Sequence, residues 1–383
     1  METKPISETS SCSPSIYDVA IDYRGGSMRN DDQLSLDRVR TLIDPLAPEQ
    51  ALHFLDCLTW FPSDANDRAA QIAEYVHVNT RHLPQFPPVV YESLLQRLCT
   101  EFPDEMTSND QMSGRWNLIP QAKLLYHLKY NLKHLLLPDD WFTFMNMGFA
   151  SLDEPIRAPV DTGDVDIWRY SRALYTEAIN GDSLEDLDVL EVGCGRGGGA
   201  LHLSTSHHTR SYTGIDYSAE NVSFCTRGRT SPGLWFQRGD AEQLDFPDDS
   251  FDAIVNVESA HCYPNFDKFV AEVVRLLRPG GRFYFSDEWW AVDVPNLYAR
   301  LSDGGLRVLS SRDITPNIIR SLDCLRAIYP SFLAGISDSS QRGIWERFFS
   351  DRVCTNSAAS YTSGRFVFLS STLTPVDVAK VTS

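Results

Sequence analysis

The sequence predicts an α/β protein built on a doubly wound, mostly parallel sheet of seven strands. After residue 186, short β-rich runs alternate with intervals long enough for a helix, which is typical of repeated βαβ units. The first run leads into a glycine-rich loop, a feature that often opens the ligand-binding edge of such a sheet. Two more β-rich runs towards the C-terminus extend the sheet. The seven runs are LDVLEVG, RSYTGIDY, GLWFQRGD, DAIVNVES, GRFYFSDEWW, LRVLSSRD and SGRFVFLSSTL.

The chain before this sheet is expected to form a helical N-terminal extension. Residues 1–30 are rich in Ser, Thr and Gly, so we expect a flexible tail there. From 31 to 114 the pattern is helical: in DANDRAAQIAEYVH, for example, apolar residues recur at i, i+3, i+4 and i+7. The polar stretch TSNDQMSG at 107–114 ends this accessory region as a linker. The main domain would then occupy residues 115–383.

Within the main domain, the pattern predicts three parts. The core sheet occupies about 186–290, a helical cap over the site about 291–360, and a last strand about 363–373. Trp289 and Trp290 stand at the junction of sheet and cap. They would either flank the mouth of a cleft or pack in the core.

The composition argues against several classes of protein. The 383 residues carry 34 basic and 52 acidic side chains, a net charge of −18, whereas a nucleic-acid-binding surface needs clustered Lys and Arg. The eight cysteines form no CxxC pair, which favours reduced thiols and no zinc or other metal site. No apolar run reaches the roughly 18 residues of a membrane span, and no signal peptide is evident. We therefore expect a soluble, cytoplasmic protein.

The glycine-rich loop GCGRGGG indicates where a cofactor would bind. Gly193, Gly195 and Gly198 satisfy the pattern GxGxxG, in which glycines let the chain turn tightly and let a ligand approach the backbone. The carboxylate of Glu191, expected to face the pocket, would repel the pyrophosphate of a nicotinamide cofactor and attract a cationic sulfonium. Asp216 follows 25 residues later, at the end of the second strand, where it can accept both hydroxyls of a ribose. The loop therefore favours a cationic nucleoside cofactor.

Four motifs occur in the order VLEVGCGRGGG, YTGIDYSAEN, RGDAEQLDFPDDSFD and EVVRLLRPGGRFYFSD, within roughly residues 140–290. In this series the chain resembles the class I S-adenosylmethionine-dependent methyltransferases, whose core is a Rossmann-like sheet. NVESAHCYP and GDAEQLDFPDDSFDA are most similar to the phthiotriol-dimycocerosate type of lipid and polyketide O-methyltransferase. The chain is more distantly similar to sterol and tocopherol methyltransferases. The resemblance implies S-adenosyl-L-methionine as the cofactor.

The resemblance also implies which residues contact the cofactor. The glycine loop would surround its methionine moiety, Asp216 its ribose, and Asp240 with Ala241 its adenine. Asn256 would present its backbone carbonyl to the amino group, and FTFMNMGF at 142–149 is similar to the segment that closes over the cofactor. The full set of expected cofactor-binding residues is Glu191, Gly193, Cys194, Gly195, Asp216, Tyr217, Asp240, Ala241, Asn256, Asn146 and Gly148.

The loop after the fourth strand, NVESAHCYPN, carries the candidate catalytic group. His261 follows an apolar strand, and a neutral imidazole with an ordinary pKa of about 6.5 can accept a hydroxyl proton near neutral pH. Asp287, at the end of the adjacent fifth strand, is the preferred partner to orient it. Glu258 is the alternative, unless it holds a loop amide instead. His261 could also be a structural or substrate-positioning residue, and no second His or Cys at ligand spacing supports a metal role.

These observations predict an enzyme that methylates a hydroxyl of a bulky hydrophobic natural product, such as a polyketide, a lipid or a related secondary metabolite, with His261 as general base. One alternative is C-methylation of an isoprenoid or sterol-like alkene. Sterol enzymes have a similar Glu, His and Pro cluster, although the spacing from Glu258 to His261 is one residue shorter here. The second alternative is a methyltransferase-like domain that binds ligands or partners without catalysis. We expect a hydrophobic small molecule as partner and no nucleic acid, and a homodimer stays open.

Overall fold

The computed structural model describes seven stretches of the chain. The predicted tail, the accessory region and the first residues of the main domain lie outside them. The predicted range of the core sheet lies inside, except for residue 264, as does the larger part of the predicted cap. The described residues are 142–156, 165–263, 265–339, 342–343, 345–346, 361–364 and 366–376.

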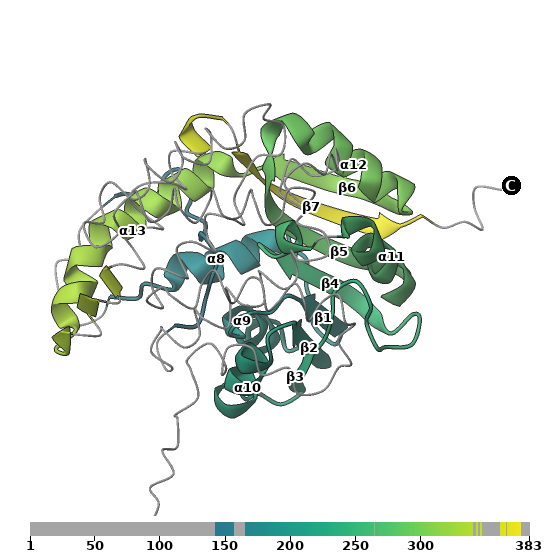
Figure 1. Ribbon diagram of the computed structural model, residues 1–383, viewed down its shortest axis with the longest axis horizontal. Coiled ribbons are helices and arrows are strands. Elements are labelled where there is room, and N and C mark those ends of the chain that lie inside the picture. Colours follow the sequence, from purple (N-terminus) through teal and green to yellow (C-terminus); the bar gives the residue numbers. More distant parts are fainter. Residues whose placement is uncertain are drawn as a thin grey trace, which may run out of the picture.

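A seven-stranded sheet forms the centre of the structure (Figure 1). Its strands lie in the order β3-β2-β1-β4-β5-β7-β6, and all run parallel except β7, which is antiparallel to both of its neighbours. The predicted fold class, a doubly wound and mostly parallel seven-stranded sheet, is therefore confirmed. The strands are β1 (Asp188–Val192), β2 (Ser211–Asp216), β3 (Leu234–Arg238), β4 (Phe251–Val257), β5 (Leu277–Trp290), β6 (Leu306–Asp313) and β7 (Phe366–Pro375).

Helices cover both faces of the sheet. α8, α9 and α13 contribute to the core cluster on one face, and α11 and α12 to the cluster on the other (Figure 1). Strand β6 is the predicted strand LRVLSSRD; it lies between α12 and α13, inside the range given to the helical cap. In the described part of the chain, no helix combines the length and the apolar character that a membrane span requires. The helices are α8 (Arg169–Ala178), α9 (Gly198–His207), α10 (Ala219–Gly228), α11 (Phe266–Leu276), α12 (Val294–Asp303) and α13 (Thr315–Gly335), with short 3-10 helices η1 (Ala260–Cys262) and η2 (Ala291–Asp293).

Local sequence explains where two helices next to the carboxyl edge of the sheet begin. α10 starts directly after β2, and its N-cap Ser218 accepts a hydrogen bond from the amide of Asn221. α11 starts after the loop that follows β4, and its N-cap Asn265 accepts from the amide of Lys268. These caps satisfy amides that a first helical turn leaves unpaired. They thereby fix the two loops from which the helices emerge.

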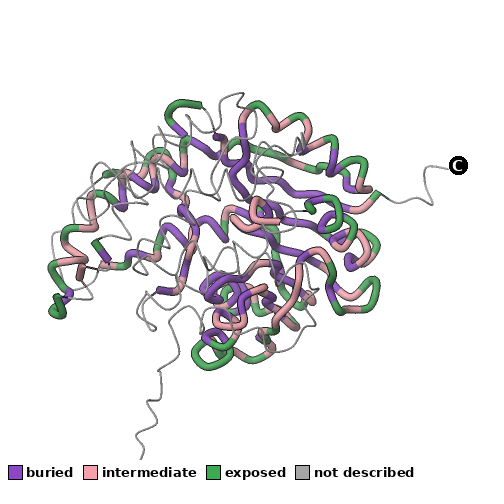
Figure 2. Tube along the Cα trace, in the orientation of Figure 1, coloured by how far each residue is buried: buried purple, intermediate pink, exposed green. Residues whose placement is uncertain are grey.

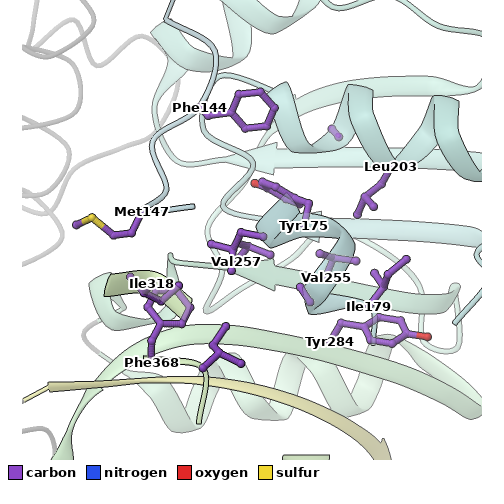
Figure 3. Close-up of a cluster of buried hydrophobic side chains, with 14 of the residues drawn as sticks. Phe144, Met147, Tyr175, Ile179, Leu203, Val255, Val257, Tyr284, Ile318 and Phe368 are labelled. Carbon is purple, nitrogen blue, oxygen red and sulfur yellow. The ribbon is translucent and has the colours of Figure 1, made fainter. Parts of the chain in front are cut away.

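The sheet separates two hydrophobic clusters. On one face, Val255 and Tyr284 pack among Ile179 at the end of α8, Leu203 of α9 and Ile318 of α13 (Figure 3). On the other face, the alternate residues of the same strands pack against α11 and α12, because successive side chains of a strand point to opposite faces. The central strands are buried on both faces, whereas the edge strand β6 is largely exposed (Figure 2).

Trp289 and Trp290 pack in the core rather than at the mouth of a cleft. They are 3% and 8% exposed. As consecutive strand residues they enter opposite clusters: Trp289 packs on Phe266, with 5.4 Å between ring centroids, and Trp290 on Phe366, with 4.3 Å. Of the two interpretations that the sequence left open, core packing is the one found.

The carboxyl ends of β1 to β5 meet along one edge of the sheet, because these five strands are parallel. β1 lies between β2 and β4, so the strand order reverses direction at this point. In open α/β sheets, ligands bind in the crevice outside the carboxyl ends at such a switch point. The fold therefore brings the predicted strand-end residues to the edge where a ligand is expected.

We predict that Gly199→Ala destabilises the protein. A Cβ added at Gly199 would lie 1.9 Å from Cζ of Tyr175, so this ring would have to move within a filled core. Overpacking of this kind costs about 1–3 kcal/mol in the free energy of unfolding. Gly228→Ala is the matched control, because Gly228 ends α10 in open space. Urea unfolding provides the measurement, and equal stability of the two variants would contradict the predicted clash.

Candidate active site

The glycine loop after β1 is held tightly against the ends of β2 and β4. The amides of Gly193 and Cys194 both donate to the carbonyl of Ile215, at 2.9 Å each. Gly193 and Gly195 have positive φ angles of 78° and 54°, and a Cβ at Gly193 would lie 1.8 Å from Oγ of Ser259. Backbone strain and lack of space both exclude a side chain at Gly193. The loop therefore presents bare backbone at the carboxyl edge of the sheet.

Glu191 is fully buried between two tyrosines, two residues before the loop. Its Oε1 and Oε2 accept hydrogen bonds from the hydroxyls of Tyr175 (2.8 Å) and Tyr212 (3.0 Å). Burial raises the pKa of Glu191 to about 7, although the two hydrogen bonds act in the opposite direction. The expected pocket-facing carboxylate is thus a buried group held by two phenols, and a cation close to it would favour its ionised form.

Asp216, at the end of β2, links the glycine loop to the start of α10. Its Oδ2 accepts from the amide of Gly195 at 2.8 Å, and its Oδ1 accepts from the amide of Ser218 at 2.9 Å and from the side chain of Asn221 at 3.2 Å. Burial raises the pKa of Asp216 to about 6, against the effect of these hydrogen bonds. The carboxylate is therefore fixed beside the backbone of the glycine loop.

Asp240, Ala241 and Tyr217 lie at the same edge. Oδ1 of Asp240 accepts from the amide of Glu242 at 3.0 Å, and Ala241 is buried in the core cluster that faces α11. Arg238 of β3 lies over the ring of Tyr217, 5.7 Å from its centroid, and donates to the backbone carbonyl of Tyr217 at 3.2 Å. These contacts tie the end of β2 to the end of β3.

Asn256, near the end of β4, is a fully buried amide. Its Nδ2 donates to the carbonyl of Val192 at 2.9 Å and to the hydroxyl of Tyr263 at 3.0 Å, and that hydroxyl lies 2.6 Å from Oγ of Ser259. Its Oδ1 has no hydrogen-bond partner among the residues that the structure describes. Since buried acceptors are nearly always paired, this oxygen indicates a site for a ligand donor such as an amino group. The sequence pointed to the backbone carbonyl of Asn256, not to its side chain.

Residues 142–150 lie across the glycine loop. A Cβ added at Gly195 would meet Cε of Met145 at 2.5 Å. The buried guanidinium of Arg196 lies over the ring of Phe224, 3.7 Å from its centroid, and 5.7 Å from the ring centroid of Phe142. Asn146 and Gly148 therefore belong to a segment in direct contact with the glycine loop.

Hydrogen bonds fix the shape of this covering segment. Nδ2 of Asn146 donates to the carbonyl of Ser171 at 3.2 Å, and its Oδ1 accepts from the amide of Gly148 at 3.1 Å. Oε2 of Glu258 accepts from the amide of Met147 at 2.7 Å. Glu258 itself has a φ of 51°, an uncommon value for a residue with a side chain. Of its two interpretations, Glu258 takes the one in which it holds a loop amide.

His261 and Asp287 form a buried pair after β4 and within β5. Asp287 accepts two hydrogen bonds from His261, one from Nδ1 to Oδ1 at 2.7 Å and one from the backbone amide to Oδ2 at 3.0 Å. The side chains are 8% and 0% exposed. Because a carboxylate accepts from Nδ1, the neutral imidazole carries its lone pair on Nε2. The arrangement can hold an imidazole in one orientation with a basic nitrogen directed away from Asp287.

Several polar groups of this site were missed in the sequence. Glu288 lies next to Asp287 and accepts from the hydroxyl of Tyr361 at 2.7 Å, and its Oε1 lies 3.9 Å from Nδ1 of His261. Acidic character next to a predicted site residue was the only signal that could have pointed to Glu288. Tyr175 and Tyr361 come from segments without a motif, whereas Tyr212 and Tyr263 lie inside YTGIDYSAEN and NVESAHCYP, motifs that gave no role to their hydroxyls. The missed residues are Tyr175, Tyr212, Ser259, Tyr263, Glu288 and Tyr361.

Comparisons with known proteins point to one family. Residues 190–285 match the family model described as a methyltransferase domain. The chain is 39% identical over 216 residues to a fatty-acid O-methyltransferase of Mycolicibacterium smegmatis, covering 56% of this chain and 78% of that protein. It is also 39% identical over 200 residues to a phthiotriol/phenolphthiotriol dimycocerosates methyltransferase of Mycobacterium tuberculosis, covering 52% of this chain and 73% of that protein.

A solved structure supports the fold independently. The crystal structure of the [4+2]-cyclase SpnF matches 67% of this chain and 97% of its own, with a TM-score of 0.50 and 20% sequence identity. The sheet, the glycine loop and the two relatives above point to one family and one cofactor. The chain therefore belongs to the class I S-adenosylmethionine-dependent methyltransferases, is an enzyme that uses S-adenosyl-L-methionine, and lies close to the fatty-acid and phthiotriol dimycocerosate methyltransferases.

Proposed function

We propose that this methyltransferase acts on a hydroxyl of a bulky hydrophobic natural product, a polyketide, a lipid or a related secondary metabolite, with His261 as general base. The observation that carries the proposal is the pair of hydrogen bonds from His261 to Asp287 at the carboxyl edge of the sheet. A lipophilic acceptor is supported by the names of the relatives, which include a fatty acid and phthiotriol dimycocerosates.

The residues at this edge fit S-adenosyl-L-methionine. The buried Oδ1 of Asn256, unpaired among the described residues, suits the amino group of the ligand. The carboxylates of Glu191 and Asp216 suit a cationic nucleoside, which would lower the pKa of both. When bound, this cofactor supplies an electrophilic methyl group on a cationic sulfur. The other residues that would hold it are Gly193, Cys194, Gly195, Tyr217, Asp240, Ala241, Asn146 and Gly148.

Methylation of a hydroxyl requires an acceptor for its proton. Because Nδ1 of His261 donates to Asp287, Nε2 would take that proton while Asp287 stabilises the resulting imidazolium. The remaining acceleration would come from holding the acceptor oxygen in line with the methyl group, since proximity and orientation dominate such a displacement. Under this proposal Glu258 positions the covering segment, because its Oε2 accepts from the amide of Met147.

C-methylation of an isoprenoid or sterol-like alkene is the second candidate. It would pass through a carbocation, which carboxylates and aromatic rings stabilise. Burial, followed by the charges of Glu288, Glu258 and Asp287, raises the pKa of Tyr361 well above its usual value, so three carboxylates act on one small region beside His261. Mass spectrometry and NMR of the product distinguish an O-methyl from a C-methyl group and decide between the two candidates.

We predict that His261→Gln lowers kcat by about 10²–10⁴, the usual contribution of a general base, and leaves the affinity for S-adenosylhomocysteine unchanged. Methyl transfer from labelled S-adenosylmethionine to a panel of lipophilic alcohols and phenols measures kcat, and calorimetry measures the affinity. His202→Gln is the control, because His202 lies on α9 and contacts Thr176. Wild-type turnover in His261→Gln would rule out the role as base.

We predict that Asp216→Asn weakens the binding of S-adenosylmethionine about 10–100-fold, the expected loss for hydrogen bonds to a charged group. Asn preserves the shape and one acceptor oxygen, so the glycine loop keeps most of its support. Calorimetric titration with S-adenosylmethionine, S-adenosylhomocysteine and NAD⁺ measures the change. Undiminished affinity would refute the ribose assignment, and NAD⁺ binding by the unmodified protein would refute the cofactor site.

We predict that Glu191→Gln stabilises the ligand-free protein at pH 8 and weakens cofactor binding. Burial raises the pKa of Glu191 from 4.5 to about 7, so the folded state holds the proton more tightly than the unfolded state. Glu191 therefore reduces stability as the pH rises from 4.5 to 7. The variant should gain about 1–3 kcal/mol at pH 8 and progressively less towards pH 5. Urea unfolding at both pH values measures this; a pH-independent difference would contradict it.

A further inference from the structure

We propose that Glu288, held by Tyr361, is a second carboxylate that positions and polarises His261; this inference rests on the proposed function. Glu288 is 1% exposed, and its Oε1 lies 3.9 Å from Nδ1 of His261. Its Oε2 accepts a hydrogen bond of 2.7 Å from the hydroxyl of Tyr361. The carboxylates of two consecutive residues, Asp287 and Glu288, therefore both lie within 4 Å of Nδ1 of His261.

The backbone of Glu288 supports the same arrangement. Its amide donates at 2.8 Å to Oδ1 of Asp287, the oxygen that also accepts from Nδ1 of His261. Glu288 thus orients Asp287 through its backbone amide, and its side chain lies beside the imidazole of His261. The hydrogen bond from the backbone amide remains when Glu288 is replaced by Gln. The effect of the side-chain carboxylate can therefore be measured separately from that of the backbone.

A hydrogen bond from Tyr361 fixes the side chain of Glu288. Tyr361 lies 73 residues further along the chain, ahead of β7, and is buried. Burial, and after it the charge of Glu288, raises the pKa of Tyr361 well above its usual value, so the hydroxyl stays protonated as a donor. A charge-assisted hydrogen bond of this kind holds one oxygen of Glu288 and leaves the other directed at His261.

Two carboxylates of β5, Asp287 and Glu288, lie within 4 Å of Nδ1 of His261. The charges of Glu288, Glu258 and Asp287 also act on Tyr361, the residue whose hydroxyl holds Glu288. Glu258 spends Oε2 on the amide of Met147. An anion within about 4–6 Å favours the protonated imidazole, so Glu288 should strengthen the basicity of His261 and stabilise the imidazolium after proton transfer.

The test is a histidine titration followed by NMR in the full chain, with ¹³C-labelled histidine and S-adenosylhomocysteine present. The His261 signal is identified by its absence in His261→Gln. Glu288→Gln should move the midpoint of the His261 titration to lower pH by about 0.5–1 unit, since it removes one of two neighbouring anions. Tyr361→Phe should move it in the same direction by less, and serves as a second variant if Glu288→Gln folds poorly.

Tyr284→Phe is the matched control. Tyr284 also donates its hydroxyl to a carboxylate, Asp182, at 2.8 Å, yet it lies away from His261 on the same strand β5. It should leave the midpoint unchanged. An unchanged midpoint in both Glu288→Gln and Tyr361→Phe would overturn the inference.

Turnover separates this inference from the proposed function. Glu288→Gln should lower kcat about 5–20-fold with unchanged affinity for S-adenosylhomocysteine, and should have no further effect in the His261→Gln background, because it acts through that residue. An equal loss in both backgrounds would mean a purely structural role and overturn the inference. Wild-type turnover in His261→Gln would instead overturn the proposed function, whatever the titration shows.

Discussion

The close approach of the glycine loop to the loop after β4 is the constraint on which the site depends. There is no room for a Cβ between Gly193 and Ser259. Ser259 contacts the hydroxyl of Tyr263, which accepts from Asn256, and Asn256 in turn donates to the carbonyl of Val192 immediately before the glycine. These contacts hold the glycine loop against the loop that follows β4. A side chain at Gly193 would force the two loops apart.

The site concentrates buried carboxylates, and each is accompanied by donors. Glu191, Asp287 and Glu288 are all 1% exposed or less. An unpaired buried charge costs several kcal/mol, so the phenols of Tyr175, Tyr212 and Tyr361 and the amides around Asp287 are part of the conditions for folding. Burial raises the pKa of Glu191 and Asp216 in the ligand-free site, and a cationic cofactor would favour the ionised form of both carboxylates.

Local periodicity and parallel topology explain what the sequence predicts correctly. Each strand is recognisable from the pattern of its own residues. The contact between His261 and Asp287 follows because the ends of adjacent parallel strands meet. Contacts between distant segments leave no local pattern in the sequence. Tyr361 reaches Glu288 across 73 residues, and Tyr175 reaches Glu191 from a helix without a motif. The orientation of single side chains, such as the amide of Asn256, also depends on packing that one sequence does not encode locally.

Glu258 connects the segment that covers the glycine loop with strand β5. Its backbone donates to Ser286 of β5 at 2.7 Å, and its carboxylate accepts from Met147, 111 residues earlier, in the segment that covers the glycine loop. A φ of 51° is unfavourable for glutamate and persists only where surrounding contacts hold it. This residue stands three positions before His261, so its hydrogen bonds tie both the covering segment and β5 to the loop that carries the imidazole. The covering segment and the loop of His261 are therefore held together by one residue in an uncommon backbone conformation.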